Sequence, residues 1–264
     1  MQRKVIKKVV KQPTAIIKPS NITRRVHNRN FKKATDDHAA RNYARKELII
    51  KESNAPSNNS VKYSTVPTLF KNETVYIIGG GPSLKNFNFA NLKGHKTIAI
   101  NKSILFHNDA DVLYWTDSRF YTWYKNDIDN FNGLKFALKP GSQYTSDINI
   151  LKKGIPHGLE KDPGVLAHGY NSGYAAINLA YHLGASRIVL LGFDMHNTNK
   201  DTHFHDGYPA SAASNYIYKD KFIPGFKELE RCLRIEGVTV FNASPHSQLN
   251  VFPKITLVQA LSFR

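Results

Sequence analysis

Cysteine is almost missing from this sequence of 264 residues, in which Cys232 is the only one. A single thiol can form neither an intramolecular disulfide nor a thiolate zinc site, which excludes disulfide-stapled domains and cysteine-based zinc modules. Long apolar runs are missing too, because none approaches the ~20 residues that span a bilayer and the N-terminal residues lack the apolar core of a signal peptide. We therefore expect a cytoplasmic protein with no membrane span.

Acidic residues are scarce, at 20 against 37 Lys and Arg, and the net charge is +17. The excess lies mainly in residues 1–60, which carry fifteen basic and four acidic side chains. Clustered Lys and Arg bind polyanions by releasing counterions, so this basic arm predicts contact with nucleic acid, an acidic protein surface or a virion component. A solvated extension without a specific partner is the alternative.

The polar segment SNAPSNNS, residues 53–60, is typical of a linker. Before it, residues 34–52 have the spacing of an amphipathic helix with a thin apolar stripe. We divide the chain into a basic extension and linker, 1–70, partly disordered or helical, and a nucleotide-binding sheet domain, 71–264.

From residue 75 onward, short apolar runs bounded by turn residues alternate with helical segments. We predict strands at 75–78, 96–100, 112–116, 134–138, 187–192 and 237–244. We predict helices at 172–184, capped by Ser172 and ended by Gly184, and at 224–237, ended by Gly237. The apolar face of the second helix comprises Phe226, Leu229, Leu233 and Ile235. This alternation predicts an α/β fold: a Rossmann-like, mostly parallel sheet with helices on both faces.

The sequence VYIIGGGPSLKNF, residues 75–87, joins a buried strand to a glycine-rich turn. In open α/β sheets ligands bind beyond the carboxyl ends of the strands, where glycines let backbone amides approach phosphate oxygens. The turn fits neither the P-loop nor the dinucleotide fingerprint, and a tight turn in which Ser83 caps a short helix is the alternative. Asn101 and Asp117 follow two later strands and are expected at the same edge, with turn formation as the alternative role of each.

The order of several motifs resembles a known family. IIGGGPSLKNF is followed about twenty residues later by AINKS, and then by YNSGYAAINLAYHLGASRIVLLGFDMH. This set resembles the core of the bacterial sialyltransferases that act on lipo-oligosaccharide, within a superfamily that includes proteins similar to hydroxymethylpterin diphosphokinase. The stretch 75–256 also resembles a bacteriophage group of morphogenetic proteins, which would place the protein in the host cytoplasm or in the virion.

The sialyltransferase resemblance implies a transferase whose donor is a CMP-linked sugar, whose acceptor is a hydroxyl group and which needs no metal. No permanently bound cofactor is expected, and dependence on a divalent metal stays open. Ser172 and Gly173, at a helix N-terminus, would hold an anionic group, which the positive end of a helix favours independently. The predicted nucleotide site comprises Gly79, Gly80, Gly81, Pro82, Ser83, Asn101, Asp117, Ser172 and Gly173.

The catalytic histidine of that family precedes the last large helix, but the matching segment IYKDKFIPGF has no histidine and offers only Tyr218 and Asp220. The segment GFDMHNTNKDTHFHDGYP, residues 192–209, carries histidines beside acids instead. We predict His205 or His203 as the base, with Asp194 as the neighbouring carboxylate. The alternatives are a zinc, manganese or iron site and a loop held by polar contacts.

Glycosyl transfer from a CMP-sugar or a similar donor to a hydroxyl acceptor is the leading hypothesis. The second is pyrophosphoryl transfer from ATP, with Mg²⁺ held by Asp117 and Asp194. The third is a phage assembly protein that keeps the fold and uses residues 1–60 to bind nucleic acid or a capsid, since a fold does not determine chemistry. Three late residues are expected either to complete the pocket or to form a turn: Asn242, Ser244 and His246. The Asp-x-Asp sequence at 109–111 precedes its strand and is expected at the opposite edge.

Overall fold

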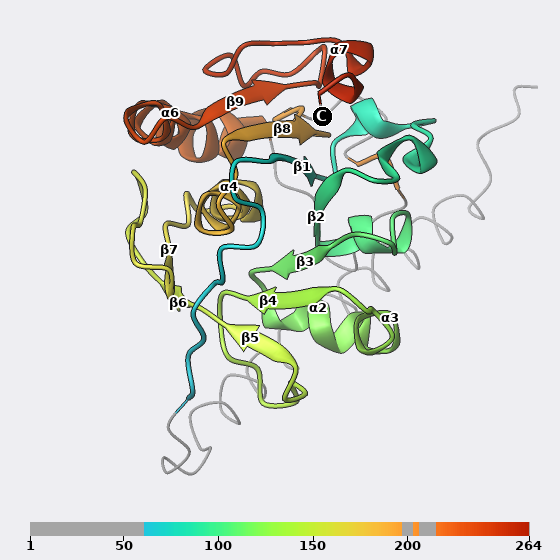
Figure 1. The fold of residues 1–264 in the computed structure, drawn as a ribbon, viewed down its shortest axis with the longest axis vertical. Coiled ribbons are helices and arrows are strands. Elements are labelled where there is room, and N and C mark those ends of the chain that lie inside the picture. The colour runs from blue at the N-terminus through green and yellow to red at the C-terminus, as the bar shows by residue number, and fades with distance from the viewer. Residues whose placement is uncertain (1–60, 197–202, 206–214, 264) are drawn as a thin grey trace, which may run out of the picture. The chain divides into compact units, whose positions relative to one another are not determined.

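A computed structural model of the protein describes residues 61–196, 203–205 and 215–263 (Figure 1). The basic arm and the predicted helix at 34–52 lie outside the described residues. Their predicted roles therefore stay predictions.

A seven-stranded parallel sheet, in the order β5-β4-β3-β2-β1-β8-β9, forms the centre of the described chain (Figure 1). Its strands are β1 (Thr74–Ile78), β2 (Lys96–Ile100), β3 (Val112–Trp115), β4 (Leu134–Ala137), β5 (Ile148–Ile150), β8 (Arg187–Leu191) and β9 (Thr239–Asn242). A separate parallel pair is formed by β6 (Lys152–Lys153) and β7 (Val165–Leu166). The predicted Rossmann-like sheet is confirmed. β5, β6 and β7 escaped prediction because two or three residues are too few for a recognisable alternation.

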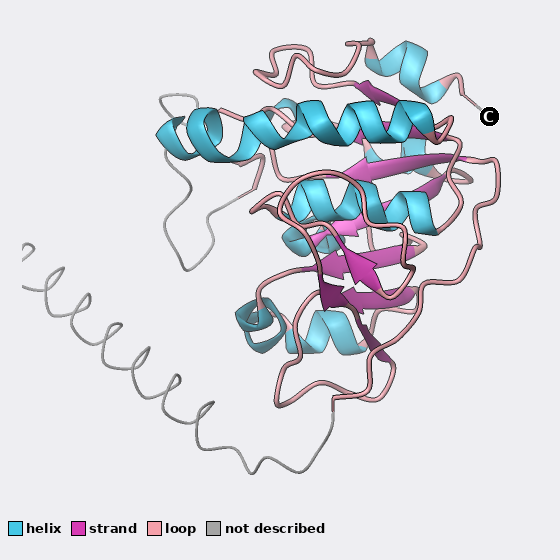
Figure 2. Cartoon of the chain, turned by 90° about the vertical axis from the view of Figure 1, so that its left-hand side faces the viewer, coloured by secondary structure: helices cyan, strands magenta, loops and turns pink. Residues whose placement is uncertain are grey.

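Helices cover both faces of the sheet, and Figure 2 shows them (cyan) in front of and behind the strands (magenta). Along β1, Val75 and Ile77 pack in the cluster that contains α4 and α6, whereas Tyr76 and Ile78 pack in the cluster on the other face. Successive strand residues point to opposite faces, so a strand buried on both sides reads as a continuous apolar run. The α-helices are α2 (Ser118–Trp123), α3 (Lys125–Asp129), α4 (Ser172–His182), α5 (Asn215–Ile217), α6 (Phe226–Ile235) and α7 (Leu257–Leu261). The 3₁₀ turns are η1 (Pro82–Leu84), η2 (Phe89–Leu92), η3 (Asn101–Leu105) and η5 (Ile223–Gly225). The segment η4 (Tyr218–Phe222) is a π-helix.

The ends of the two predicted long helices agree with the sequence in part. Gly184 and Gly237 adopt φ values of +96° and +76°, so both predicted glycine stops are confirmed. The cap of α4 is Asn171 rather than Ser172, because the Asn171 side chain accepts a hydrogen bond from the Tyr174 amide at 2.8 Å. Ile235 is 65% exposed, so its predicted place on the buried face of α6 is wrong.

Residues 61–70 belong to the sheet domain, although the sequence interpretation placed them in the extension. Val66 and Phe70 are buried in the core beside α4. The amide of Phe70 donates to the Leu183 carbonyl at 2.7 Å, and the amide of Ser64 donates to the Ile150 carbonyl at 2.8 Å. Chain contacts group Val61–Arg264 as one unit.

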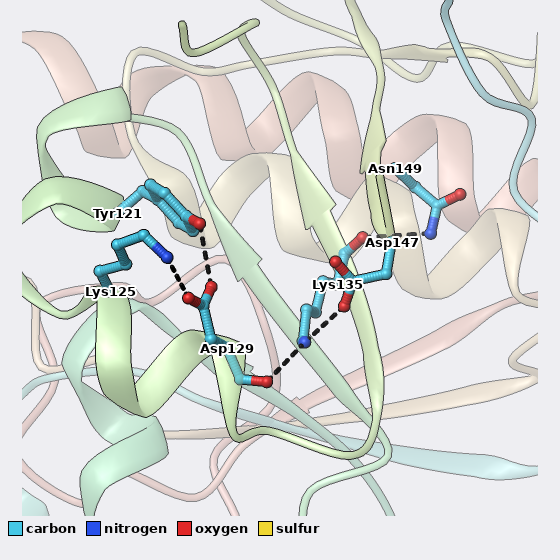
Figure 3. A network of polar contacts seen from close by, with 6 residues as sticks. All are labelled: Tyr121, Lys125, Asp129, Lys135, Asp147 and Asn149. Atoms are coloured by element: carbon cyan, nitrogen blue, oxygen red, sulfur yellow. Dashed lines mark hydrogen bonds and ion pairs between the residues drawn. The ribbon is translucent and has the colours of Figure 1, made fainter. Parts of the chain in front are cut away.

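A polar network fastens α3 and the β4–β5 connection to the sheet (Figure 3). The Lys135 ammonium, which is nearly buried, lies 2.6 Å from the Asp147 carboxylate and donates to the Asp129 carbonyl at 3.3 Å. The Asp129 side chain in turn accepts from Tyr121 at 2.9 Å and pairs with Lys125. A buried ammonium is costly unless it is paired and hydrogen-bonded, so the burial of Lys135 depends on its pairing with Asp147.

Candidate functional site

The strand order places a crevice between β1 and β8. These strands are neighbours, yet the chain proceeds from β1 towards β2 on one side and from β8 towards β9 on the other. Loops that leave the carboxyl ends of two such strands diverge and form a crevice. A cavity of about 450 Å³ lies there, within the size range of small-molecule sites.

Nine of the twelve predicted site residues line this cavity: Gly79, Gly80, Gly81, Asn101, Asp117, Ser172, Gly173, Asp194 and His203. Residues from five segments of the sequence therefore meet at one edge of the sheet. The other three, Pro82, Ser83 and His205, are not part of the lining.

The glycine turn packs against the loop that follows β8. The amide of Gly79 donates to the Leu191 carbonyl at 2.8 Å, and the amide of Gly81 donates to the Gly192 carbonyl at 2.9 Å. Two of the three amides expected to face phosphate are therefore engaged within the protein. The Gly80 amide makes no hydrogen bond to any described residue, and it is the one that the turn offers to a ligand.

Asp194 fastens these two loops together. Its carboxylate accepts hydrogen bonds from the Ser83 hydroxyl at 2.7 Å and from the Ser83 amide at 3.3 Å. Ser83 therefore does not line the cavity. It does not cap η1 either, because the cap residue of that turn is Gly81. The buried carboxylate holds the turn in place at the cavity wall, and its predicted pairing with a histidine base stays a prediction.

The N-terminus of α4 forms the opposite wall. The side chain of Asn171 satisfies the Tyr174 amide, and the earlier amides of Ser172 and Gly173 are left at the cavity. The Ser172 hydroxyl donates to the Thr116 hydroxyl at 3.0 Å, which positions the first turn relative to the end of β3. Free amides at the positive end of a helix form an anion-binding arrangement.

Asp117 lines the cavity and is paired there with Arg119. It caps α2 by accepting from the Arg119 amide at 3.0 Å, and its carboxylate also accepts from the Arg119 guanidinium at 2.9 and 3.0 Å. Burial raises the pKa of Asp117, but the hydrogen bonds and charge of Arg119 outweigh it, so the pKa lies below its usual range. The guanidinium lies 5.3 Å from the ring centroid of Trp123, and both side chains line the cavity. This stack offers a planar surface and a fixed cation.

Asn101 has a left-handed backbone conformation, with φ of +50°, at the junction of β2 and η3. Its side chain lines the cavity and makes no hydrogen bond to any described residue. Asparagine tolerates this conformation better than most residues, so the predicted turn-forming role and a ligand-facing role are compatible at this position.

His203 and His205 belong to an aromatic wall beside the glycine turn. Their rings stack with centroids 5.1 Å apart, and Phe106 stacks on His205 at 5.9 Å. Burial, and secondarily the charge of Lys102, lowers the pKa of His203. A neutral imidazole at the cavity can accept a proton, so the structure favours His203 over His205 as the candidate base.

Sequence reasoning missed several lining residues. Tyr218, from the segment that lacks the expected histidine, lines the cavity, whereas Asp220 is exposed and does not. Burial and the Asp194 charge raise the pKa of Tyr218, so its hydroxyl stays protonated and can donate a hydrogen bond. The other lining residues outside the predicted site include Arg119, Trp123, Asn171, Phe193, His196 and Phe222. His196 belongs to the predicted histidine segment, and Asn171, Phe193 and Phe222 lie within quoted motifs without an assigned role. No motif covers Arg119 and Trp123.

Asn242, Ser244 and His246, which were expected to complete the pocket, contact other residues of the protein and do not line the cavity. Ser244 is fully buried and its hydroxyl accepts from the Phe193 amide at 2.8 Å, while Asn242 donates to Ser247 at 3.0 Å. The His246 carbonyl accepts from the His196 ring at 3.1 Å. None of the three lines the cavity, so the turn-forming alternative holds for them.

The metal alternatives find little support in the donor groups. Among the described residues, no three His, Cys, Asp or Glu side chains come together as a metal-binding group. Asp206, an acid of the predicted histidine segment at 192–209, lies outside those residues. Asp111 accepts from the Thr97 amide at 2.8 Å at the start of β2, so the Asp-x-Asp sequence lies at the opposite edge as expected.

In the part of the chain that the structure describes, no helix has the length and apolar character to cross a membrane.

No protein-family model matches the sequence, and no curated protein matches it significantly. Among solved structures, the chain is similar to the MAf glycosyltransferase from Magnetospirillum magneticum AMB-1, with a TM-score of 0.52 and 14% identity, over 78% of this chain and 37% of that chain. It also matches the Campylobacter jejuni sialyltransferases CstII, in complex with cytidine-5'-monophosphate (TM-score 0.44, 16% identity, 70% of this chain and 86% of that chain), and Cst-I (TM-score 0.40, 19% identity, 75% and 83%). The likeness to the MAf enzyme shows a fold that occurs in a glycosyltransferase, of which this chain spans little more than a third.

Proposed function

We propose that the protein is a glycosyltransferase that transfers a sugar from a nucleotide-activated donor, with a CMP-sugar favoured, to a hydroxyl acceptor. One observation carries this proposal: the cavity at the β1–β8 switch point gathers unengaged amides, a helix N-terminus and a neutral histidine in about 450 Å³. The motif order resembles that of lipo-oligosaccharide sialyltransferases, and the fold occurs in the MAf glycosyltransferase.

In this proposal the acceptor oxygen attacks the anomeric carbon of the donor sugar, and the bond from that carbon to the phosphate oxygen breaks. His203 takes the hydroxyl proton, and the nucleotide leaves with the bonding electron pair. The amides of Gly80, Ser172 and Gly173 and the phenol of Tyr218 stabilise the negative charge that develops on the phosphate. Arg119, stacked on Trp123, offers a contact for the base or for a carboxylate of the donor.

Pyrophosphoryl transfer from ATP finds less support. It needs carboxylates to hold Mg²⁺, and Asp117 is paired with Arg119 while Asp194 holds Ser83. The assembly function depends on residues 1–60, which lie outside the described residues, and no feature of the described residues favours it over the transferase.

Calorimetric titration with CMP, UDP and GDP tests the proposal, and CMP is expected to bind best. Ser172→Pro removes one wall amide and leaves the helix intact, because proline is tolerated at the first helical position and Asn171 already has the extended backbone that precedes a proline. Loss of a charge-assisted hydrogen bond predicts about tenfold weaker binding or more. Ser172→Ala, which keeps the amide, is the matched control. Absence of binding by all three nucleotides would contradict the proposal.

A further inference from the structure

Three exposed lysines come from separate segments: Lys139 after β4, Lys153 in β6 and Lys221 in η4. Their positive charges act together on His168, whose pKa is lowered by burial and then by Lys153, His157, Lys139 and Lys221. No acidic group contributes to this shift. We call Lys139, Lys153 and Lys221 the basic rim.

Tyr170 lies beside Lys221 of the basic rim. It is 45% exposed, and the Lys221 ammonium lies 4.8 Å from its ring centroid. The rings of His168 and His157 approach its edge, with centroids 4.9 and 5.7 Å away. The Tyr170 amide donates to Nδ1 of His168 at 3.2 Å, which holds this bulky residue at an uncommon φ of +59°. An aromatic ring is thus presented to solvent among cations.

The basic rim adjoins the mouth of the cavity at three points. Tyr170 directly precedes Asn171 and Ser172, and Lys221 directly precedes Phe222, all lining residues. The charge of Lys139 contributes to the lowered pKa of Asp117 inside the cavity. Figure 1 shows the β6–β7 pair, which carries Lys153, beside α4.

We propose that the basic rim binds an acidic carbohydrate acceptor, with a carboxylate or phosphate of the sugar on the lysines and a sugar ring on Tyr170. The acceptor role rests on the proposed glycosyl transfer, whereas binding of the acidic sugar does not. Charge complementarity selects an anion, since exposed cations attract anions over a Debye length of ~10 Å. The single exposed ring favours a saccharide over single-stranded nucleic acid, which uses successive aromatic platforms.

The test compares binding to the full-length chain of tetragalacturonic acid (carboxylate), glucose 6-phosphate (phosphate), neutral maltotetraose and a short single-stranded DNA. The test variant is Lys153→Ala with Lys221→Ala. Lys139 stays in place because it also acts on Asp117 in the cavity. The control is Lys71→Ala with Lys93→Ala, which removes the same charge from exposed lysines elsewhere. Every variant retains residues 1–60, so the basic arm contributes equally to each.

At least one acidic sugar is expected to bind, with neutral maltotetraose much weaker, and the test variant should weaken binding about tenfold, as expected for two exposed charges. Tyr170→Asn, which keeps a residue tolerant of positive φ, should also weaken it, and the control should not. The identity of the acidic sugar that binds separates carboxylate from phosphate recognition. Acidic sugars that bind no better than maltotetraose, or equal binding by test and control variants, would overturn the proposal. DNA binding that depends on Lys153 and Lys221, without sugar binding, would also overturn it.

Titration of the same variants with CMP, UDP and GDP separates the two proposals. The basic rim stands if acidic sugars need its lysines while all three nucleotides fail to bind, and in that case the proposed transferase falls. If CMP binds all variants equally and no acidic sugar does, the transferase stands and the basic rim falls.

Discussion

At the scale of single residues, Gly81 has no space for a side chain. A Cβ atom there would lie 2.0 Å from the Asp194 carboxylate and 2.6 Å from the Gly192 carbonyl. We expect Gly81→Ala to lower the free energy of unfolding by about 1–3 kcal/mol, because the clash involves backbone and a buried side chain. In Gly164→Ala, where the nearest atoms would be 3.3 Å away or more, the change should stay below about 1 kcal/mol. Equal losses in urea denaturation would show that the two loops are not packed as described.

His203 carries the prediction on pH. If it is the base, the neutral ring is active, so the rate should fall as the pH drops through its pKa. Because burial lowers that pKa, the acid limb of kcat/KM should have its midpoint below pH ~6.5. His203→Gln should reduce the rate about 10²–10⁴-fold with nucleotide binding retained.

The control for that experiment is His95→Gln, whose pKa burial also lowers and which lies near the start of β2. A normal rate in His203→Gln, or a midpoint above pH ~6.5, would rule out this histidine as the base.

Most of the site residues predicted from the sequence line the cavity, because polar or glycine residues directly after apolar strands can be recognised and parallel strands bring their ends to one edge. The sequence could not show what each of them contacts. Asp194 contacts Ser83 from a distant segment of the chain, and Asp117 contacts Arg119 at the start of α2. No motif encodes either contact. Tyr218 reaches the cavity from a π-helix, which has no sequence signature comparable to a strand end.

At the scale of secondary-structure elements, the start of α4 combines stability and ligand binding. The side chain of Asn171 caps the helix, so Asn171→Ala should cost about 1 kcal/mol in the free energy of unfolding. Asn171→Asp keeps an acceptor and should be close to neutral, and Ser172→Ala should cost less than Asn171→Ala because Ser172 is not the cap. Thermal unfolding of the three variants checks this order. If Ser172→Ala lowered the free energy of unfolding more than Asn171→Ala, Ser172 would be the cap, as the sequence predicted.

At the scale of the whole molecule, the sequence predicted a mostly parallel sheet but not the order of its strands. Apolar runs at regular spacing indicate a parallel sheet, but neighbouring strands such as β1 and β8 pair over a separation that local pattern does not report. The start of the domain was placed about ten residues too late, because Val66 and Phe70 are isolated apolar residues in a polar stretch.

Two truncations test where the domain begins. Removal of residues 1–60 should leave the melting temperature of the sheet domain nearly unchanged, since Val61–Arg264 is one unit. Removal of residues 1–70 also takes away the buried side chains of Val66 and Phe70, and a core loss of that kind costs about 2–5 kcal/mol per large side chain. Differential scanning calorimetry of both forms is the measurement. Equal melting temperatures would mean that residues 61–70 do not stabilise the fold.

The most direct measurement is a crystal structure of the protein grown with saturating CMP. The phosphate should lie between the Gly80 amide and the first amides of α4, with the base towards Arg119 and Trp123. Density for CMP elsewhere on the molecule, or solvent alone between β1 and β8 at full saturation, would contradict nucleotide binding at this site.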